Sequence, residues 1–335
     1  MDMMRDKIAG ALYGQAFGDA MGMPAELWGK KRTFEYFKGP ITDLVDGPKS
    51  NPVAFNYTKG QFTDDTSQSL VLLDSLAATD FVPQPKDIAE RMLVWAEEWD
   101  AWKNNILGPT TKVALASFKE GKSAKAFTDK ALSNGSAMRI GPVGALFHPD
   151  DKKKLVDFVY HVSEATHTSD VTIAGAAMIA EGVASAIVHS DFEKVLEDIY
   201  AVEPIGYERG AETFSPRLAE RLKIGIQFAR ELKGQDRLFL DRIYAVVGAG
   251  VPIIESVPAA ISIAYYAQDP EKCGYLCANL GGDTDTIGAM ATSICGAFTG
   301  ASRLTEEHRH LLETANGIHF DHYVDILMKG REKLK

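Results

Sequence analysis

Three segments of the chain combine a helical pattern with many small residues, and they constrain the fold more than any other feature. These segments cover residues 6–22, residues 171–188 and the run that follows Gly288. Glycine inside a helix costs roughly 1 kcal/mol relative to alanine unless close packing offsets it. We therefore expect the helix over 6–22 to be central, and to end at Gly22 before the break at Met23-Pro24. Its expected buried positions are Ala9, Gly10, Gly14, Ala16 and Gly18.

The rest of the chain also favours helices, and no stretch shows convincing strand alternation. Further helices are expected over 86–102, 112–118 and 253–266, two or three amphipathic ones between 192 and 248, and peripheral ones over 305–316 and 321–329. Residues 30–59 have no sustained period and predict a long irregular loop. The sequence thus predicts an all-α fold, a compact orthogonal bundle of about a dozen helices. We expect one domain over 1–335, with a core over about 6–302 and peripheral C-terminal helices over 303–335.

Composition excludes several classes of function. The net charge of −10 argues against a nucleic acid as the main partner, because nucleic-acid-binding proteins usually carry a basic patch. The N-terminus lacks a signal-peptide pattern, and we see no apolar run near the 18 or so residues of a membrane span. The three cysteines predict buried free thiols in a reducing compartment. We expect a cytoplasmic protein without membrane attachment, either a monomer or a weak homodimer.

Two acidic stretches stand at expected helix starts, far apart in the sequence. One is Thr63-Asp64-Asp65-Thr66, and the other is Gly281-Gly282-Asp283-Thr284-Asp285-Thr286. Taken alone, each is explained by the preference of Asp and Thr for helix N-caps. If the two starts met, four carboxylates would converge with no Lys or Arg in either stretch, and repulsion would raise their pKa values or recruit cations. Oxygen ligands favour Mg²⁺, Mn²⁺ or Ca²⁺ over Zn²⁺.

These two stretches, preceded by the segment from Gly18 to Glu26, resemble the motifs of the ADP-ribosylglycohydrolase family, in the family's order and from about residue 8 to 300. The resemblance implies a glycohydrolase that cleaves the C1″ ribosyl bond of ADP-ribosylated protein side chains or of a small ADP-ribosyl compound. It implies catalytic roles for Glu26, Asp64 and Asp65, with Glu26 beside the metals and the scissile end of the ribose. It also implies two Mg²⁺ or Mn²⁺ ions held by Thr63, Asp64, Asp65, Asp283, Asp285 and Thr286.

The resemblance further implies residues that bind substrate. The loop at 133–139 is similar to the family's ribose- and diphosphate-lining loop, and Thr166-His167 is similar to a pair that contacts substrate. The implied substrate-binding residues are Asn105, Gly108, Asn134, Gly135, Ser136, Met138 and His167. Ile106 stands where many members carry Asp, which leaves the exact substrate open.

Three alternatives remain open at this stage. The chain could hydrolyse a small ribosyl compound such as a nucleoside, for which the altered segment from Asn105 to Thr111 is the main indication. It could be a non-catalytic relative resembling lens crystallins, although the complete set of metal-type ligands speaks against that role. A two-metal phosphohydrolase fits the ligand chemistry but not the spacing.

Overall fold

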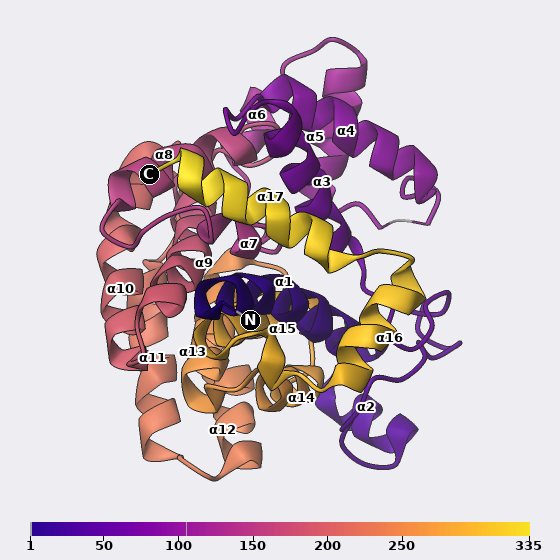
Figure 1. The fold of residues 1–335 in the computed structure, drawn as a ribbon. Coiled ribbons are helices and arrows are strands. Elements are labelled where there is room, and N and C mark those ends of the chain that lie inside the picture. Colours follow the sequence, from indigo (N-terminus) through magenta and orange to yellow (C-terminus); the bar gives the residue numbers. More distant parts are fainter. Residues whose placement is uncertain (1, 105) are drawn as a thin grey trace.

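The computed structural model describes residues 2–104 and 106–335, and within these ranges it contains seventeen α-helices and only isolated β-bridges. The prediction of an all-α fold is confirmed (Figure 1). In chain order the helices are α1 (Met3–Gly22), α2 (Lys30–Phe37), α3 (Asp64–Ala78), α4 (Pro85–Glu98), α5 (Pro109–Lys119), α6 (Lys125–Thr128), α7 (Gly141–Gly144), α8 (Lys152–Ser163), α9 (Asp170–Val188), α10 (Phe192–Arg209), α11 (Leu218–Glu231), α12 (Asp236–Arg242), α13 (Ile253–Ala267), α14 (Pro270–Ala278), α15 (Thr284–Thr299), α16 (Glu306–Asn316) and α17 (Phe320–Lys333).

Helices α1 and α15 pack against each other in antiparallel fashion along a row of glycines. A Cβ atom added to Gly10 would lie 2.0 Å from the carbonyl oxygen of Gly296, and one added to Gly18 would lie 2.2 Å from that of Gly288. Hydroxyl groups of α15 bond to α1 in the same contact, because Thr292 donates to the Gly14 carbonyl at 2.6 Å. Only glycine permits this approach, so the small-residue pattern in the sequence encodes the central helix pair.

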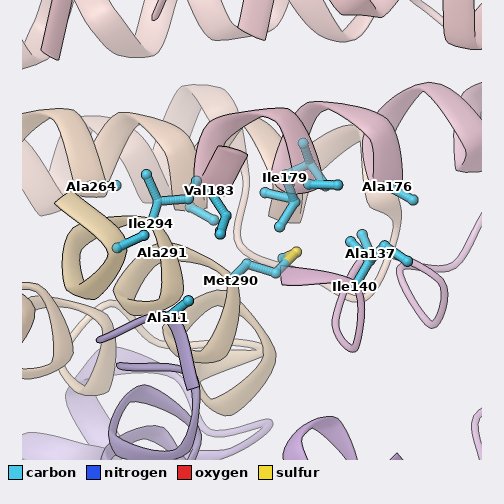
Figure 2. Close-up of a cluster of buried hydrophobic side chains, with 14 of the residues drawn as sticks. Ala11, Ala137, Ile140, Ala176, Ile179, Val183, Ala264, Met290, Ala291 and Ile294 are labelled. Atoms are coloured by element: carbon cyan, nitrogen blue, oxygen red, sulfur yellow. The ribbon is translucent and has the colours of Figure 1, made fainter. Parts of the chain in front are cut away.

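The core extends from this helix pair to α9, as Figure 2 shows. Ile179 and Val183 of α9 and Met290 and Ile294 of α15 are at most 1% exposed and belong to one apolar cluster. Burial on this scale is the main source of helix stability in a folded domain, since short isolated helices are marginal in water.

Helix α9 corrects one statement drawn from the sequence. Its 19 residues, with a mean hydropathy of 1.8, are long and apolar enough to cross a membrane. However, 94% of that helix window is buried inside the protein. The segment is therefore a core helix, and its apolar composition suits the apolar side chains that surround it inside the protein. The cytoplasmic location stays a prediction.

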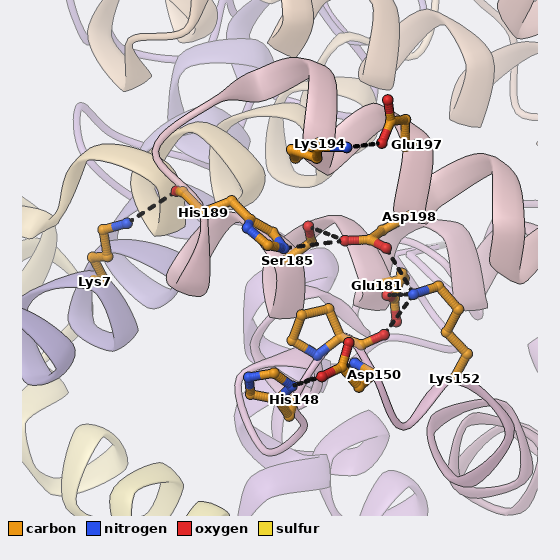
Figure 3. Close-up of polar contacts among 11 residues, drawn as sticks. Lys7, His148, Asp150, Lys152, Glu181, Ser185, His189, Lys194, Glu197 and Asp198 are labelled. Carbon is orange, nitrogen blue, oxygen red and sulfur yellow. Dashed lines mark hydrogen bonds and ion pairs between the residues drawn. The ribbon is translucent and has the colours of Figure 1, made fainter.

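One charged side chain interrupts the apolar surface of α9. Glu181 is 0% exposed, and its carboxylate lies 3.2 Å from the Lys152 ammonium, which also pairs with Asp198 at 2.7 Å. Figure 3 shows Lys152 reaching both carboxylates. Burial raises the pKa of Glu181 to about 8, although the positive charge of Lys152 opposes this shift. A buried carboxylate with a single shared cation is a costly arrangement.

The sequence-based boundaries need two corrections. Residues 30–59 are not irregular throughout, because α2 occupies Lys30–Phe37 before the chain turns at Lys38, which has a left-handed φ of 57°. The predicted helix over 86–102 ends earlier, at Glu98, because Asp100 adopts a left-handed φ of 48°. A short helix and a chain reversal are both set by local backbone conformations that periodicity does not reveal.

Candidate active site

The start of α3 is fixed by a carboxylate from α1. Asp19 is fully buried, and its carboxylate accepts the backbone N–H and the hydroxyl of Thr63 at 2.9 and 2.8 Å. It also accepts the backbone N–H and the hydroxyl of Thr66, at 2.9 and 2.6 Å. Asp19 therefore satisfies the backbone N–H of the N-cap residue Thr63 and the first-turn N–H of Thr66, in place of a local side-chain cap. Asp64 and Asp65 do not act as caps: Asp64 accepts from the Gln68 amide at 3.2 Å, and Oδ2 of Asp65 lies 3.0 Å from the Thr63 hydroxyl.

The start of α15 is held beside the end of α1. The Thr284 hydroxyl donates to the Gly22 carbonyl at 2.7 Å, and the backbone of Gly282 exchanges hydrogen bonds with Leu27 and Trp28. Gly282 has a positive φ of 86°, and a Cβ there would lie 2.1 Å from the Ala249 carbonyl oxygen. The Gly-Gly turn thus brings the loop that carries Glu26 against the acidic start of α15.

The two acidic helix starts converge, and Glu26 joins them. Burial, followed by the negative charges of Asp283, Asp64 and Asp65, raises the pKa of Glu26 well above its ordinary value. The pKa of Asp285 is raised in the same way, first by burial and then by Glu26 and Asp283. These mutual effects require short separations between groups that lie more than 200 residues apart in the sequence. Each helix start is therefore more than an isolated cap.

The remaining carboxylates of this site also favour the protonated form. Burial raises the pKa of Asp64 to about 7, with Asp19 and Asp283 adding repulsion. Burial raises the pKa of Asp283 to about 6, although a hydrogen bond from Asn134 opposes that shift. Burial raises the pKa of Asp65 well above its ordinary range. This concentration of carboxylates favours either protonation of some of them or the binding of cations.

The donor set fits a hard divalent cation. Asp65 and Asp285 each have one buried carboxylate oxygen, Oδ1, without a hydrogen-bond partner. The neighbouring donors are the hydroxyls of Thr63 and Thr286, so the set consists of oxygen ligands only. No three His, Cys, Asp or Glu side chains within residues 2–104 and 106–335 are already arranged to hold an ion.

The loop at 133–139 lies beside the acidic start of α15. The Asn134 side-chain amide donates to the Asp283 carboxylate at 2.6 Å and to the Ser256 hydroxyl at 3.2 Å. Gly135 packs on the imidazole of His167, because a Cβ there would lie 2.8 Å from its Cε1 atom. The structure thus brings Asn134 to the acidic cluster, whereas Gly135 lies against His167. Their contact with substrate stays a prediction.

Three other predicted substrate residues are buried. Met138 is 7% exposed, whereas Ser136 and His167 are 0% exposed. Ser136 donates to the Thr172 carbonyl, and His167 bonds to the hydroxyls of Thr166 and Ser133. Burial and the charge of Arg139 lower the pKa of His167 to about 3, so the imidazole is neutral. In this arrangement His167 supports the loop at 133–139 through its contacts with Ser133 and Gly135.

The segment that starts α5 lies on the other side of this loop. Gly108 is exposed and forms the N-cap of α5, while the Thr110 hydroxyl lies 3.2 Å from the Ser133 hydroxyl. Ile106 is half-buried and packs against the core. Asn105, another predicted substrate residue, lies outside the described residues.

The sequence-based site omits residues that the structure places there. Asp19 lies within the segment from Gly18 to Glu26 that resembles a family motif, but only its burial in the structure indicates that it belongs to the site. Tyr57 lies close to the cluster, since burial and the charges of Asp64 and Glu26 raise its pKa. Asn51 is 1% exposed and donates to the carbonyl of Glu26 at 3.0 Å. Tyr57 and Asn51 fall in a segment without periodicity, so no sequence signal could have identified them.

Comparisons with known proteins agree with this geometry. The profile of the ADP-ribosylglycohydrolase family matches residues 1–334. The chain is 41% identical to the uncharacterized protein YegU of Escherichia coli K12 over 332 residues, covering 99% of both chains. It is 23% identical to ADP-ribosylhydrolase ARH3 of Bos taurus, covering 92% of this chain and 88% of that one. A solved ADP-ribosylglycohydrolase-related protein complex shares the fold, with a TM-score of 0.68, 23% identity and full coverage of both chains. The acidic helix starts and the match along nearly the whole chain together place this protein in the ADP-ribosylglycohydrolase family.

Proposed function

We propose that this protein is a hydrolase that cleaves the C1″ bond of an ADP-ribosyl group, on a protein side chain or on a related small compound, with the help of two Mg²⁺ or Mn²⁺ ions. The observation that carries the proposal is the convergence of the acidic starts of α3 and α15 around Glu26. Relatives named as ADP-ribosylhydrolases, such as the bovine one, support the choice of substrate class.

The ligands of the ions would be Thr63, Asp64, Asp65, Asp283, Asp285 and Thr286. Bound there, the ions would supply Lewis-acid and template chemistry for the ribose hydroxyls and for a water molecule. The side-chain donors and acceptors already present, such as the Asn134 amide on Asp283, orient this ligand shell.

Glu26 has the properties of a proton donor for the departing group. Its side chain is half-buried, so it is accessible, and burial together with the neighbouring carboxylates raises the pKa of Glu26, which favours the protonated form. Asn51 holds the backbone of Glu26 through its carbonyl. Glycosidic bonds break through an oxocarbenium-like state, in which a positioned carboxylic acid protonates the leaving atom.

A second candidate is a hydrolase of a smaller ribosyl compound. The observation in its favour is Ile106, which packs against the core where many family members carry Asp. A carboxylate is therefore missing from the position that would orient a larger leaving group.

Calorimetric titration of ADP-ribose, with Mn²⁺ or Mg²⁺ and again after chelation, tests the proposal. We expect binding with a micromolar Kd, roughly −8 kcal/mol, only when the cation is present. Absence of binding in both conditions, with the cation itself still bound, would favour the smaller substrate.

A pair of variants on α3 makes the test specific. Asp65→Asn should abolish cation-dependent binding of ADP-ribose. Asp74→Asn is the matched control, because Asp74 lies on the same helix, is partly buried, and is instead close to Tyr323. Equal loss in both variants would contradict the metal-site assignment.

A further inference from the structure

Arg139 is a buried cation whose hydrogen bonds go to neutral groups. It is 1% exposed, and it donates to the Gln68 side-chain carbonyl at 2.7 Å and to the Thr166 hydroxyl at 2.5 Å. No ion pair of Arg139 occurs among the residues the structure describes. A buried guanidinium without a paired carboxylate is costly, so its retention calls for an explanation.

The first arm from Arg139 leads to the acidic cluster. Arginine is only a donor, so the Gln68 oxygen must face Arg139 and the Gln68 nitrogen must face away. That nitrogen lies 3.2 Å from the Oδ2 atom of Asp64, to which it donates. Arg139 therefore fixes the amide orientation in which Gln68 donates to the Oδ2 atom of Asp64.

The second arm leads through His167. The Thr166 hydroxyl is buried, and within the part of the chain that the structure describes it bonds to Arg139 and to the Nδ1 atom of His167, at 2.9 Å. The N–H group of Arg139 excludes the hydroxyl proton from its side, so that proton is directed to Nδ1, the remaining partner. Nδ1 is then an acceptor, so the neutral imidazole carries its proton on Nε2.

The second arm continues to the surface of the site. Nε2 lies 3.1 Å from the Ser133 hydroxyl, which accepts from it and can then donate to the Thr110 hydroxyl at 3.2 Å. Thr110 is half-buried at the first turn of α5. When Ser133 donates to Thr110, the hydroxyl proton of Thr110 points away from Ser133 and can be donated to an oxygen atom of a bound ligand.

We propose that Arg139 is a positioning residue that sets the hydrogen-bond direction along both arms, through Gln68 to Asp64 and through Thr166, His167 and Ser133 to Thr110. One arm ends at Asp64 of the acidic cluster, and the other ends at Thr110 at the start of α5. The importance of these end points rests on the proposed function, but the directions themselves do not.

The His167 tautomer tests the proposal without any ligand. In protein labelled with ¹⁵N-histidine, the His167 signals are assigned by their loss in His167→Gln. We expect a single Nε2–H tautomer in the unaltered protein, and a mixture of both tautomers in Arg139→Met and in Thr166→Val. Thr166→Val keeps the size and leaves Arg139 in place, so it remains informative if Arg139→Met does not fold. An Nδ1–H tautomer in the unaltered protein, or a single Nε2–H tautomer in Thr166→Val, would overturn the proposal.

Two further variants distinguish an effect that passes along one arm from a general loss of packing in the protein. Gln68→Met should leave the His167 tautomer unchanged and weaken binding of Mn²⁺ alone by about tenfold, the effect of one lost charge-assisted hydrogen bond. Arg331→Met is the matched control, because Arg331 is 7% exposed and donates only to the carbonyls of Ala145 and Phe147. A mixture of His167 tautomers in Arg331→Met would mean that the loss of an unrelated buried arginine also disturbs the tautomer. That result would overturn the proposal as well. If ADP-ribose fails to bind while the tautomer results hold, the proposed function fails and the role of Arg139 stands.

Discussion

The contact between α1 and α15 gives the sharpest stability prediction, through Gly14→Ala. A Cβ at Gly14 would lie 2.2 Å from the Thr292 carbonyl oxygen, whereas an ordinary contact begins at 3.4 Å. The two backbones would have to separate by about 1.2 Å, because neither atom belongs to a flexible side chain. The Thr292 hydroxyl, which donates to the Gly14 carbonyl at 2.6 Å, would lose much of that bond.

The expected net effect of Gly14→Ala follows from three contributions. Overpacking of a core costs about 1–3 kcal/mol, and a weakened buried hydrogen bond costs about 1 kcal/mol more. Alanine recovers about 1 kcal/mol through its higher helix propensity. We therefore expect the free energy of unfolding to fall by about 1–3 kcal/mol.

Urea denaturation in the presence of a chelator measures this change. Gly29→Ala is the matched control for stability, because nothing lies within 4 Å of a Cβ at Gly29 and its φ is −76°. The control should stay within about 0.5 kcal/mol of the unaltered protein. If Gly14→Ala were as stable as the unaltered protein, the argument that glycines set the helix separation would be refuted.

Three other variants test the buried carboxylates. The folded protein holds a proton on Glu181 up to a pKa of about 8, whereas the unfolded chain releases it near the ordinary value of 4.5, so stability falls as pH rises between these values. Glu181→Gln should flatten that part of the stability-pH curve, measured by urea denaturation from pH 5 to 9, and an unchanged slope would contradict the raised pKa of Glu181 in the folded protein. Asp285→Asn replaces a carboxyl group whose pKa is raised well above its ordinary value, because the folded protein disfavours its charged form. The substitution should therefore raise the Tm at pH 8 in the presence of a chelator. It should also abolish the further rise in Tm that Mn²⁺ causes in the unaltered protein. An unaltered response to Mn²⁺ would exclude Asp285 as a ligand. Glu26→Gln should lower turnover of an ADP-ribosylated substrate by about 100-fold or more while ADP-ribose still binds, and normal turnover would leave Glu26 without a catalytic role.

The sequence by itself determined the helical class and the residue types available at the candidate site. Periodicity and small residues identified the central segment that became α1, and α3 and α15 do begin at the acidic stretches. These features are local, because a helix start and an apolar stripe are encoded within a few turns. The motifs around Asp64 and Asp285 also indicated the family before any coordinates were considered.

Only the tertiary structure decided how these stretches cooperate. Asp19 caps α3 from another helix, and the backbone of Leu27 bonds to that of Gly282, so each contact joins distant segments. The burial of His167 and its position between Thr166 and Ser133 likewise depend on the packing of the loop at 133–139 against the segment that precedes α9. Such contacts leave no period in the sequence, since a side chain's partner is set by the folded chain and not by its neighbours. The sequence therefore specified which groups could perform the chemistry, and packing specified which of them meet.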